Sequence, residues 1–415
     1  MAVIKPFQCI RPTIENASKI AALPYDVYNS LEARKEVEKQ PLSFLRIDRA
    51  ETQFDHPIDG HELAVYQKAK ELLEEMINQG QFIKDTEECY YIYELTMNNR
   101  SQTGLVACAS IDDYLEGVIK KHENTRTEKE LDRINHVDIC NAQTGPIFLA
   151  YRSKDAINKL ICKSKKEIPL YDFTSEDNVT HRVWRISNIE DISKLHENFH
   201  EIKHIYIADG HHRAASAVKV GLKRRKEHPS FTRKEEFNYF LSVLFPEKEL
   251  KILPYNRAIK DLNGLTTEDF INKIANKFDI TKLGTESFAP DTKGTFGMFL
   301  EGIWYKLIIK DIYKESTDPV ESLDVSILQK NLFNEILGIL DPCTDERIDF
   351  IGGIRGLKEL ELRTSNDMKV SFSMYPTDIS ELFVVSDMGK LMPPKSTWFE
   401  PKLRSGLFIH KLTKI

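Results

Sequence analysis

The order of apolar and polar positions along the chain predicts alternating strands and helices. His204–Ala208 is an apolar run typical of a buried strand, and the small residues of Ala214–Val218 predict a helix that lies close against a neighbour. Ala64–Asn78 carries its apolar residues on one helical face, with Gly80 just beyond its end. This pattern predicts an amphipathic helix that stops at a glycine.

Turn residues divide the remaining apolar runs into hairpins and single elements. Cys89–Leu95 and Gly104–Ile111 flank Asn98 and Asn99, an arrangement typical of a β-hairpin, and a second hairpin is predicted within Thr295–Ile309. Further strands are expected at Ala2–Ile4, Pro146–Tyr151, His181–Ile186, Lys369–Met374 and Leu407–His410, and further helices at Thr267–Lys277, at Leu323–Leu340 and after Asn29, which has capping-box spacing to Glu32. Hairpins and crossovers in one chain predict an α+β (mixed α/β) fold with a mixed sheet.

Length, charge and cysteine spacing narrow the class of protein. The 415 residues suffice for two or three domains, and we expect a region 1–250 with a C-terminal α/β region 251–415 packed on it. The net charge of -6 disfavours binding to nucleic acid or to an anionic membrane, and the apolar runs are too short to span a bilayer. Met1–Pro6 lacks signal-peptide features and the six cysteines lack metal or redox spacing, so a cytoplasmic protein with reduced thiols is expected.

The strongest candidate for chemistry is the turn between the predicted strand and helix near residue 210. It places Asp209, Gly210, His211, His212 and Arg213 in succession at a helix N-terminus. Unpaired N–H groups and the helix dipole favour anions such as phosphate there, and a glycine lets a ligand approach the backbone. A guanidinium can grip two phosphate oxygens at once. The alternative is a plain helix N-cap, with Asp209 accepting from the N–H of His211 or His212.

Three other segments carry polar residues where turns are expected. Asp26 follows Pro24, which fixes the backbone and could hold the carboxylate rigidly; the alternative is an Asx-turn. In the second segment, His122 and Glu123 offer a general base and a carboxylate.

The same polar stretch continues to Arg126 and Arg133, which are candidates for anion contacts; a surface loop is the alternative for the whole stretch. The third segment, Met392–Gly406, contains Lys395, Lys402 and Arg404, which could line a pocket for anions or serve a structural role.

Metal binding has only a weak signature in the sequence. His211 and His212 are adjacent, so on a helix their side chains diverge by about 100° and do not readily share one ion. Asp26, Glu123 or Asp209 could hold Mg²⁺ through water beside a phosphate. The sequence does not fix a metal-ligand set.

Long motifs resemble the family of domain of unknown function 1015. They are Leu23–Val27, Lys121–Thr125, Tyr206–Arg213, Ile252–Arg257, Asp349–Gly356 and Met392–Phe399, and together they extend over most of the chain. The Asp209–Arg213 turn is also similar to that of free-serine kinases built on the ParB/sulfiredoxin-like fold. This resemblance implies a ParB/sulfiredoxin-like core around the strand–turn–helix, with additional C-terminal α/β structure.

The resemblance also implies roles for residues of the turn. Asp209 would contact substrate or metal, and His211, His212 and Arg213 would contact nucleotide phosphates. Those kinases use a glutamate near their N-terminus, and Asp26 is the candidate for that role here.

The leading hypothesis is a phosphotransferase for free L-serine or O-phosphoserine that uses ATP or ADP with Mg²⁺. A phosphoserine phosphatase, a ParB-like nucleotide- or DNA-binding module without turnover, and a purely structural protein are the alternatives. The leading hypothesis predicts that Asp26, His122, Glu123 and Asp209 converge on one cavity. The sequence leaves the oligomeric state open.

Overall fold

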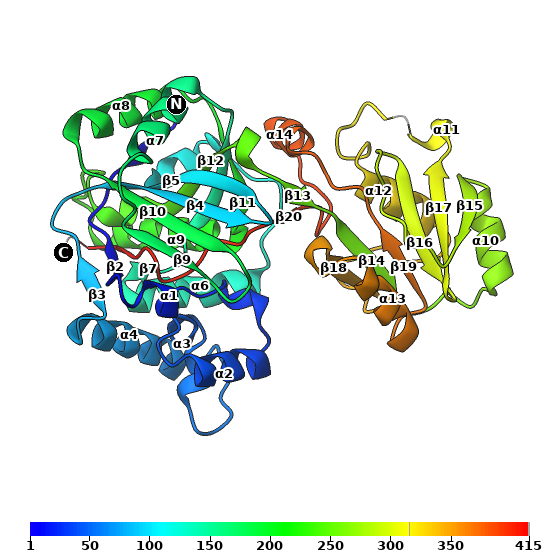
Figure 1. Cartoon of the computed structure of the whole chain (residues 1–415), viewed down its shortest axis with the longest axis horizontal. Coiled ribbons are helices and arrows are strands. Elements are labelled where there is room, and N and C mark those ends of the chain that lie inside the picture. The colour runs from blue at the N-terminus through cyan, green and yellow to red at the C-terminus, as the bar shows by residue number, and fades with distance from the viewer. Residues whose placement is uncertain (315, 414–415) are drawn as a thin grey trace. The chain divides into compact units, whose positions relative to one another are not determined.

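The computed structural model describes residues 1–314 and 316–413 and confirms a mixed α/β fold (Figure 1). The chain divides into two compact units, the first formed by Met1–Leu250 with Pro401–Ile415 and the second by Lys251–Glu400. Pro401–Ile415 therefore groups with the N-terminal part of the chain, although the expected C-terminal region 251–415 included it. None of the helices in the described part of the chain has the length and apolar character of a membrane span.

The N-terminal part of the first unit is a small helical layer. Its helices are α1 (Ala17–Ile20), α2 (Ser30–Lys39), α3 (Leu45–Asp48) and α4 (Leu63–Asn78). The expected capping box is present at α2, where Asn29 accepts from the N–H of Glu32 and Glu32 accepts from the N–H of Asn29. The predicted apolar face of α4 is buried, including Leu72 and Leu73.

The main sheet of the first unit is mixed and nine-stranded. Its order is β6-β11-β8-β12-β5-β4-β10-β9, with β1 also paired to β5. The strands are β1 (Ile4–Lys5), β4 (Tyr90–Met97), β5 (Arg100–Ser110), β6 (Ile119–Lys120), β8 (Ile147–Tyr151), β9 (Tyr171–Thr174), β10 (Thr180–Ile186), β11 (Ile205–Asp209) and β12 (Tyr239–Pro246). The predicted first hairpin is β4–β5, and its turn residues Asn98 and Asn99 have φ of 51° and 61°, which asparagine tolerates.

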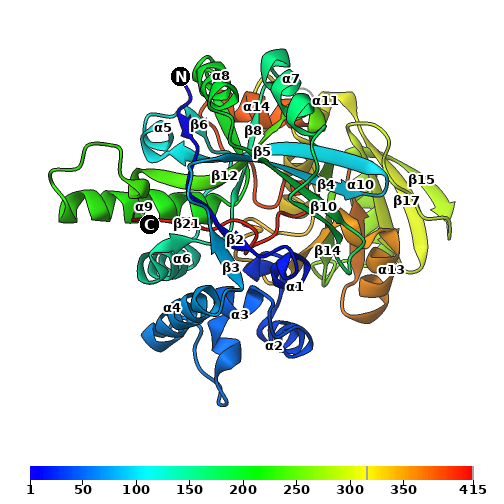
Figure 2. The same cartoon turned by 60° about the vertical axis from the view of Figure 1, so that its left-hand side comes forward.

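Helices cover one face of this sheet (Figure 2). They are α5 (Ile111–Leu115), α7 (Asp155–Ser164), α8 (Ile189–His200) and α9 (His211–Glu227). Alternate residues of each strand point into their shared core, such as Ile205 and Ile207 of β11, while Ala214 and Ala217 allow α9 to lie close to the sheet.

The opposite face meets residues 401–413, which we call the C-terminal segment. Phe408 of this segment packs against Tyr91 and Tyr93 of β4. Ile409 forms an antiparallel bridge with Ile10, and β21 (His410–Lys411) pairs with β7 (Ala142–Gln143). A further pair joins β2 (Ile10–Pro12) to β3 (Phe82–Lys84). The C-terminal segment is thus an integral part of the first unit.

The second unit is a six-stranded antiparallel sheet with helices. Its order is β15-β17-β16-β19-β14-β18, formed by β14 (Tyr255–Ile259), β15 (Phe278–Gly284), β16 (Thr295–Leu300), β17 (Ile303–Ile309), β18 (Ile348–Gly352) and β19 (Val370–Ser373). A separate pair joins β13 (Ile252–Leu253) to β20 (Trp398–Phe399). The helices are α10 (Thr267–Ala275), α11 (Asp311–Lys314), α12 (Asp324–Leu328), α13 (Leu357–Asn366) and α14 (Ile379–Asp387).

One predicted helix of the second unit was wrong in its extent. The expected α-helix Leu323–Leu340 is α-helical only as α12, and a π-helical stretch follows at Gln329–Asn334. Gly338, at φ of 69°, follows the turn at residues 335–337. A wider π turn does not change the apolar pattern enough for periodicity to reveal it.

Candidate functional site

Parallel pairing of β6 with β11 brings the two central motifs together. Ile119 is paired with Ile205 and Lys120 with Tyr206, so the two strands run toward the same edge of the sheet. Residues 121–126 leave that edge from β6, and α9 begins there after β11. The motifs are more than 80 residues apart along the chain, and this pairing makes them neighbours.

The polar stretch after β6 is only partly a loop. Thr127–Cys140 forms helix α6, so the alternative of a surface loop for His122–Arg133 was wrong beyond Arg126. The helix was not recognisable from the sequence because most of its residues are polar. Only a narrow face is buried, against α4 and α9. Among the buried residues of α6 is Arg133, a sequence-predicted site residue.

The turn before α9 differs from a plain N-cap. Gly210 itself occupies the N-cap position, at φ of 90°, in a conformation that favours glycine. Asp209 accepts from the N–H of Gly210 at 2.7 Å and from Lys402 Nζ of the C-terminal segment at 3.0 Å. The alternative in which Asp209 caps the helix by accepting from His211 or His212 was therefore wrong.

The charges around Asp209 keep its carboxylate ionised. Burial alone would raise the pKa of this carboxyl, but Lys402 and Arg213 outweigh burial and hold the pKa well below its ordinary value. The positive end of the α9 dipole acts in the same direction. Asp209 is consequently a strong acceptor of hydrogen bonds and a candidate metal ligand, but a weak proton acceptor.

Arg213 folds back over the turn. Its Nη1 donates to the carbonyl of Pro146 at 2.6 Å, and a Cβ added to Gly210 would lie 3.0 Å from its Nη2. Its guanidinium also faces Gly145 on the neighbouring β7–β8 loop. Gly210 thus makes room for the Arg213 side chain itself, beside the N-terminus of α9.

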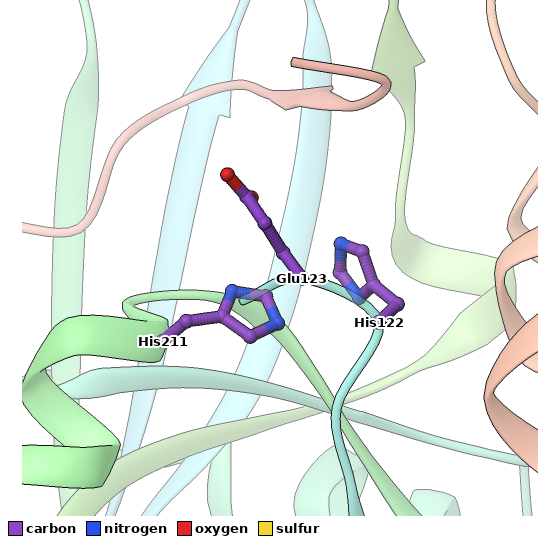
Figure 3. A group of neighbouring side chains, drawn as sticks. All are labelled: His122, Glu123 and His211. Atoms are coloured by element: carbon purple, nitrogen blue, oxygen red, sulfur yellow. The ribbon is translucent and has the colours of Figure 1, made fainter. Parts of the chain in front are cut away.

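His122, Glu123 and His211 form one group at this edge (Figure 3). Each offers a ligand atom, and these atoms lie within 4.8 Å of one another. The two rings meet edge to face with their centroids 4.5 Å apart. Burial lowers the pKa of His122 to about 4, and burial together with the neighbouring His122 holds the pKa of His211 well below its ordinary value. Both rings are therefore neutral near pH 7 and can act as nitrogen ligands.

His212 points elsewhere, as expected for its position beside His211. Its Nε2 accepts from the backbone N–H of Arg126 at 3.0 Å and so fixes the end of the 121–126 loop. The Arg126 residue itself is exposed. In this structure His212 therefore positions the loop that carries His122 and Glu123.

Two cavities that share lining residues lie in the first unit, and the smaller of them is beside this turn. The larger has a volume of about 960 Å³ and is lined by Asp26, and the smaller is lined by Arg213. Tyr25 and Arg133 line both, and the guanidinium carbon of Arg133 lies 3.9 Å from the centre of the Tyr25 ring. Asp48 and His136 are also common to both.

The predicted site residues thus fall into two neighbouring groups. His122, Glu123 and His211 lie together, with Asp209 close enough to influence the pKa of both rings. Asp26 and Arg133 face the larger cavity. Arg213 belongs to both groups, because it affects the pKa of Asp209 and lines the smaller cavity.

Two features of the site were not predicted from the sequence: Tyr25 lines both cavities, and Lys402 pairs with Asp209. Tyr25 directly precedes the singled-out Asp26, and an aromatic residue at that position was the available signal. Lys402 was expected either to line a pocket for anions or to serve a structural role, and in the structure it pairs with a carboxylate. Arg404 has a structural role, because it is buried and bonds to Asp177 and His181.

Comparison with solved structures finds distant similarities. A free serine kinase in complex with AMP is 14% identical, with 72% of this chain and 91% of that chain covered and a TM-score of 0.35. SbnI with C-terminal truncation from Staphylococcus aureus is 11% identical, with 73% and 87% covered and a TM-score of 0.39. A conserved hypothetical protein from Pyrococcus furiosus is 16% identical, with 74% and 95% covered and a TM-score of 0.36.

No curated protein matches the chain. The family model described as "Protein of unknown function (DUF1015)" matches residues 4–326, which is most of the sequence. That match includes all of the residues at the Asp209–Arg213 turn and the 121–126 loop. The chain belongs to the DUF1015 family.

Proposed function

We propose that this protein is a phosphotransferase that moves a phosphoryl group between a nucleotide, ATP or ADP, and the hydroxyl of free L-serine. The observation that carries the proposal is the position of Arg213. Its guanidinium lies over Gly210 at the N-terminus of α9 and also lines a cavity that adjoins the larger one. A phosphate bound there would meet a helix N-terminus and a guanidinium together.

The larger cavity supports a ligand of nucleotide size. Its volume of about 960 Å³ lies within the range typical of small-molecule sites. Its wall contains Arg34, Arg49 and Arg133 and the ring of Tyr28. It also contains seven carboxylates, and Arg49 and Arg133 pair with two of them, Glu51 and Asp132. Phosphoryl transfer depends chiefly on positioning and on neutralising charge, so a bound Mg²⁺ would supply much of the positive charge beside this wall.

The two candidate carboxylates suit different roles. Asp209 has a strongly lowered pKa, so it fits the role of orienting the serine hydroxyl or holding Mg²⁺ through water. Asp26 is exposed to the larger cavity and fits the role of accepting the hydroxyl proton as the serine oxygen bonds to phosphorus. The bridging P–O bond breaks and its electrons leave with the nucleotide. Mg²⁺ would neutralise charge on the transferring phosphate.

The test is direct turnover with a pair of isosteric variants. Purified protein is incubated with L-serine, Mg²⁺ and either ATP or ADP, and O-phosphoserine is measured by mass spectrometry. We expect product with one nucleotide, and a loss of at least about a hundredfold in Asp209→Asn and in Asp26→Asn. Lys159→Met, at an exposed position on α7, is the matched control and should keep full activity.

Other outcomes identify the alternatives. Release of phosphate from O-phosphoserine without any nucleotide acceptor would show that the protein is a phosphatase and not a kinase. Salt-sensitive retention of duplex DNA without turnover would favour the nucleic-acid-binding module. Full activity in both Asp209→Asn and Asp26→Asn would overturn the role of these carboxylates.

A further inference from the structure

We propose that His122, Glu123 and His211 bind one divalent transition-metal ion, of which Zn²⁺ is the best match. The site lies at the edge of the main sheet where β6 and β11 end (Figure 3). It adjoins the turn assigned to phosphate, but its test needs neither serine nor a nucleotide. This metal differs from the Mg²⁺ of the proposed phosphotransfer because the donor atoms differ.

The first argument is the geometry of the three side chains. Figure 3 shows His122 and His211 beside each other, with the Glu123 side chain extending above them from the same loop as His122. Their donor atoms lie within 4.8 Å of one another, whereas donors around a tetrahedral Zn²⁺ are about 3.3 Å apart. Metal binding would draw the side chains together, and Glu123, which is only half-buried, has room to move.

The second argument is a buried polar atom of His211. The residue His211 is 6% exposed, and its Nε2 has no hydrogen-bond partner among the described residues. A buried polar atom left without a partner destabilises the fold. A metal ion would satisfy this nitrogen at a position where the fold supplies no donor or acceptor.

The surrounding structure orients the ligands as a metal site requires. The His122 ring makes a hydrogen bond with the backbone of Ile207, a core residue of β11. Such a bond fixes the tautomer and the ring orientation and leaves the other nitrogen as an electron-pair donor. His212 fixes the same loop through the N–H of Arg126. The two ligands of the loop are thus held from two sides.

The donor set selects the class of metal. Two imidazole nitrogens and one carboxylate oxygen suit Zn²⁺, Co²⁺, Fe²⁺ or Mn²⁺, whereas Mg²⁺ and Ca²⁺ prefer oxygen ligands throughout. Three protein ligands leave a position for water or for an oxygen of a bound anion, which is the arrangement of catalytic rather than structural zinc. The N-terminus of α9 beside His211 would favour an anion at that open position.

The experiment measures metal directly. Protein stripped with a chelator is dialysed against Zn²⁺ and its metal content is determined, and Co²⁺ is added separately to read the visible spectrum of a low-symmetry site. We expect one equivalent of Zn²⁺ and a cobalt spectrum. His211→Gln and Glu123→Gln should each lower the affinity by at least about tenfold.

The matched control is another histidine pair in the same unit. His196 and His200 stand one turn apart on α8 with ring centroids 6.5 Å apart, and such a surface pair can also attract metal. His196→Gln combined with His200→Gln should leave the stoichiometry and affinity unchanged. Because His211 is buried, Glu123→Gln in the loop keeps the test decisive if the His211 variant does not fold.

Failure is clear and separate from failure of the proposed function. Absence of Zn²⁺ and Co²⁺ binding in the wild-type protein, or binding unaffected by both ligand variants, overturns the metal site. Serine phosphorylation with Mg²⁺ would still be measurable in that case. Conversely, metal binding without phosphoserine formation would support the metal site and contradict the proposed phosphotransferase activity.

Discussion

Lys402 Nζ lies 3.0 Å from Asp209 Oδ2, although 193 residues separate the two along the chain. Their side chains are 16% and 34% exposed, so the pair is partly shielded from water. The contact connects the C-terminal segment to the turn that begins α9. Lys402 is thus one of the two cations, with Arg213, that lower the pKa of the Asp209 carboxyl.

Removal of this lysine should lower stability in a pH-dependent way. Lys402→Met leaves Asp209 half-buried without its ion pair, and we expect a loss of about 1–2 kcal/mol in the free energy of unfolding at pH 7. The pKa of Asp209 is lowered in the folded protein, so its contribution is present above the unfolded pKa of about 4 and lost as the pH falls below it. Urea unfolding at pH 7 and at pH 3 measures both values.

Lys159→Met serves as the control for that experiment, since Lys159 is exposed on α7. It should change stability by less than about 0.5 kcal/mol at either pH. Equal losses in the two variants would contradict a special role for the Lys402–Asp209 pair.

A methyl group at Gly210 should test the space beneath Arg213. Gly210→Ala places a side chain at φ of 90° and within 3.0 Å of the guanidinium, so we expect a stability loss of about 1–2 kcal/mol and weaker anion binding. Gly80→Ala is the control, because Gly80 has φ of 73° but nothing within 4 Å of the added Cβ. It should show the stability loss alone, as measured by thermal unfolding and phosphate titration.

Arg213→Lys tests whether the planar guanidinium of Arg213 is needed in addition to its positive charge. Lysine keeps the positive charge but cannot hold the Pro146 carbonyl and an anion with one rigid fork. We expect a stability loss of about 1 kcal/mol and at least about tenfold weaker nucleotide binding by calorimetry. The bond to Pro146 is the reason to expect an effect on stability as well as on binding.

The control for Arg213 is Arg182→Lys on strand β10, where a partly exposed arginine pairs with Asp172. Nucleotide affinity should not change in that variant. An equal fall in affinity in both proteins would assign the effect to general charge rather than to the turn.

Acid should destabilise the protein partly through His181. Burial, with Arg404 nearby, lowers the pKa of His181 to about 3, so the folded state keeps this ring neutral while the unfolded state binds a proton below pH 6.5. This difference in proton binding does not change the free energy of unfolding above pH 6.5. Below that pH it lowers the free energy of unfolding, increasingly as the pH falls toward the folded pKa. His181→Gln should therefore lose less stability than the wild type between pH 6.5 and 4, by up to about 3 kcal/mol.

Urea unfolding across that pH range checks this difference, with His200→Gln at an exposed position as the control. Parallel pH dependence in wild type and His181→Gln would contradict the lowered pKa.

Local patterns predicted much of the first unit. The capping box at Asn29, the apolar face of α4 and the asparagine turn of the first hairpin depend on neighbours in sequence, and the structure confirms all three. The strand β11 and the start of α9 are also where the pattern predicts them. Such elements are encoded by spacing of 2 or 3.6 residues and by turn residues.

Long-range relations could not be predicted in the same way. The pairing of β6 with β11, which unites His122 with His211, depends on strand order in the sheet. Helix α6 was not predicted, because its buried face contains few apolar residues and so gives no helical pattern of apolar positions. The ParB/sulfiredoxin-like character of the core and the roles of the site residues remain predictions.

The C-terminal segment has a consequence for how the protein is made. The second unit is translated between the two parts of the first, so Lys402 leaves the ribosome only after residues 251–400 have been synthesised. Until then Asp209 lacks its cation, β7 lacks its partner strand and Ile10 lacks its bridge to Ile409. The Asp209 turn is therefore completed late in synthesis, and a nascent first unit carries an unfinished site while the second unit is still emerging.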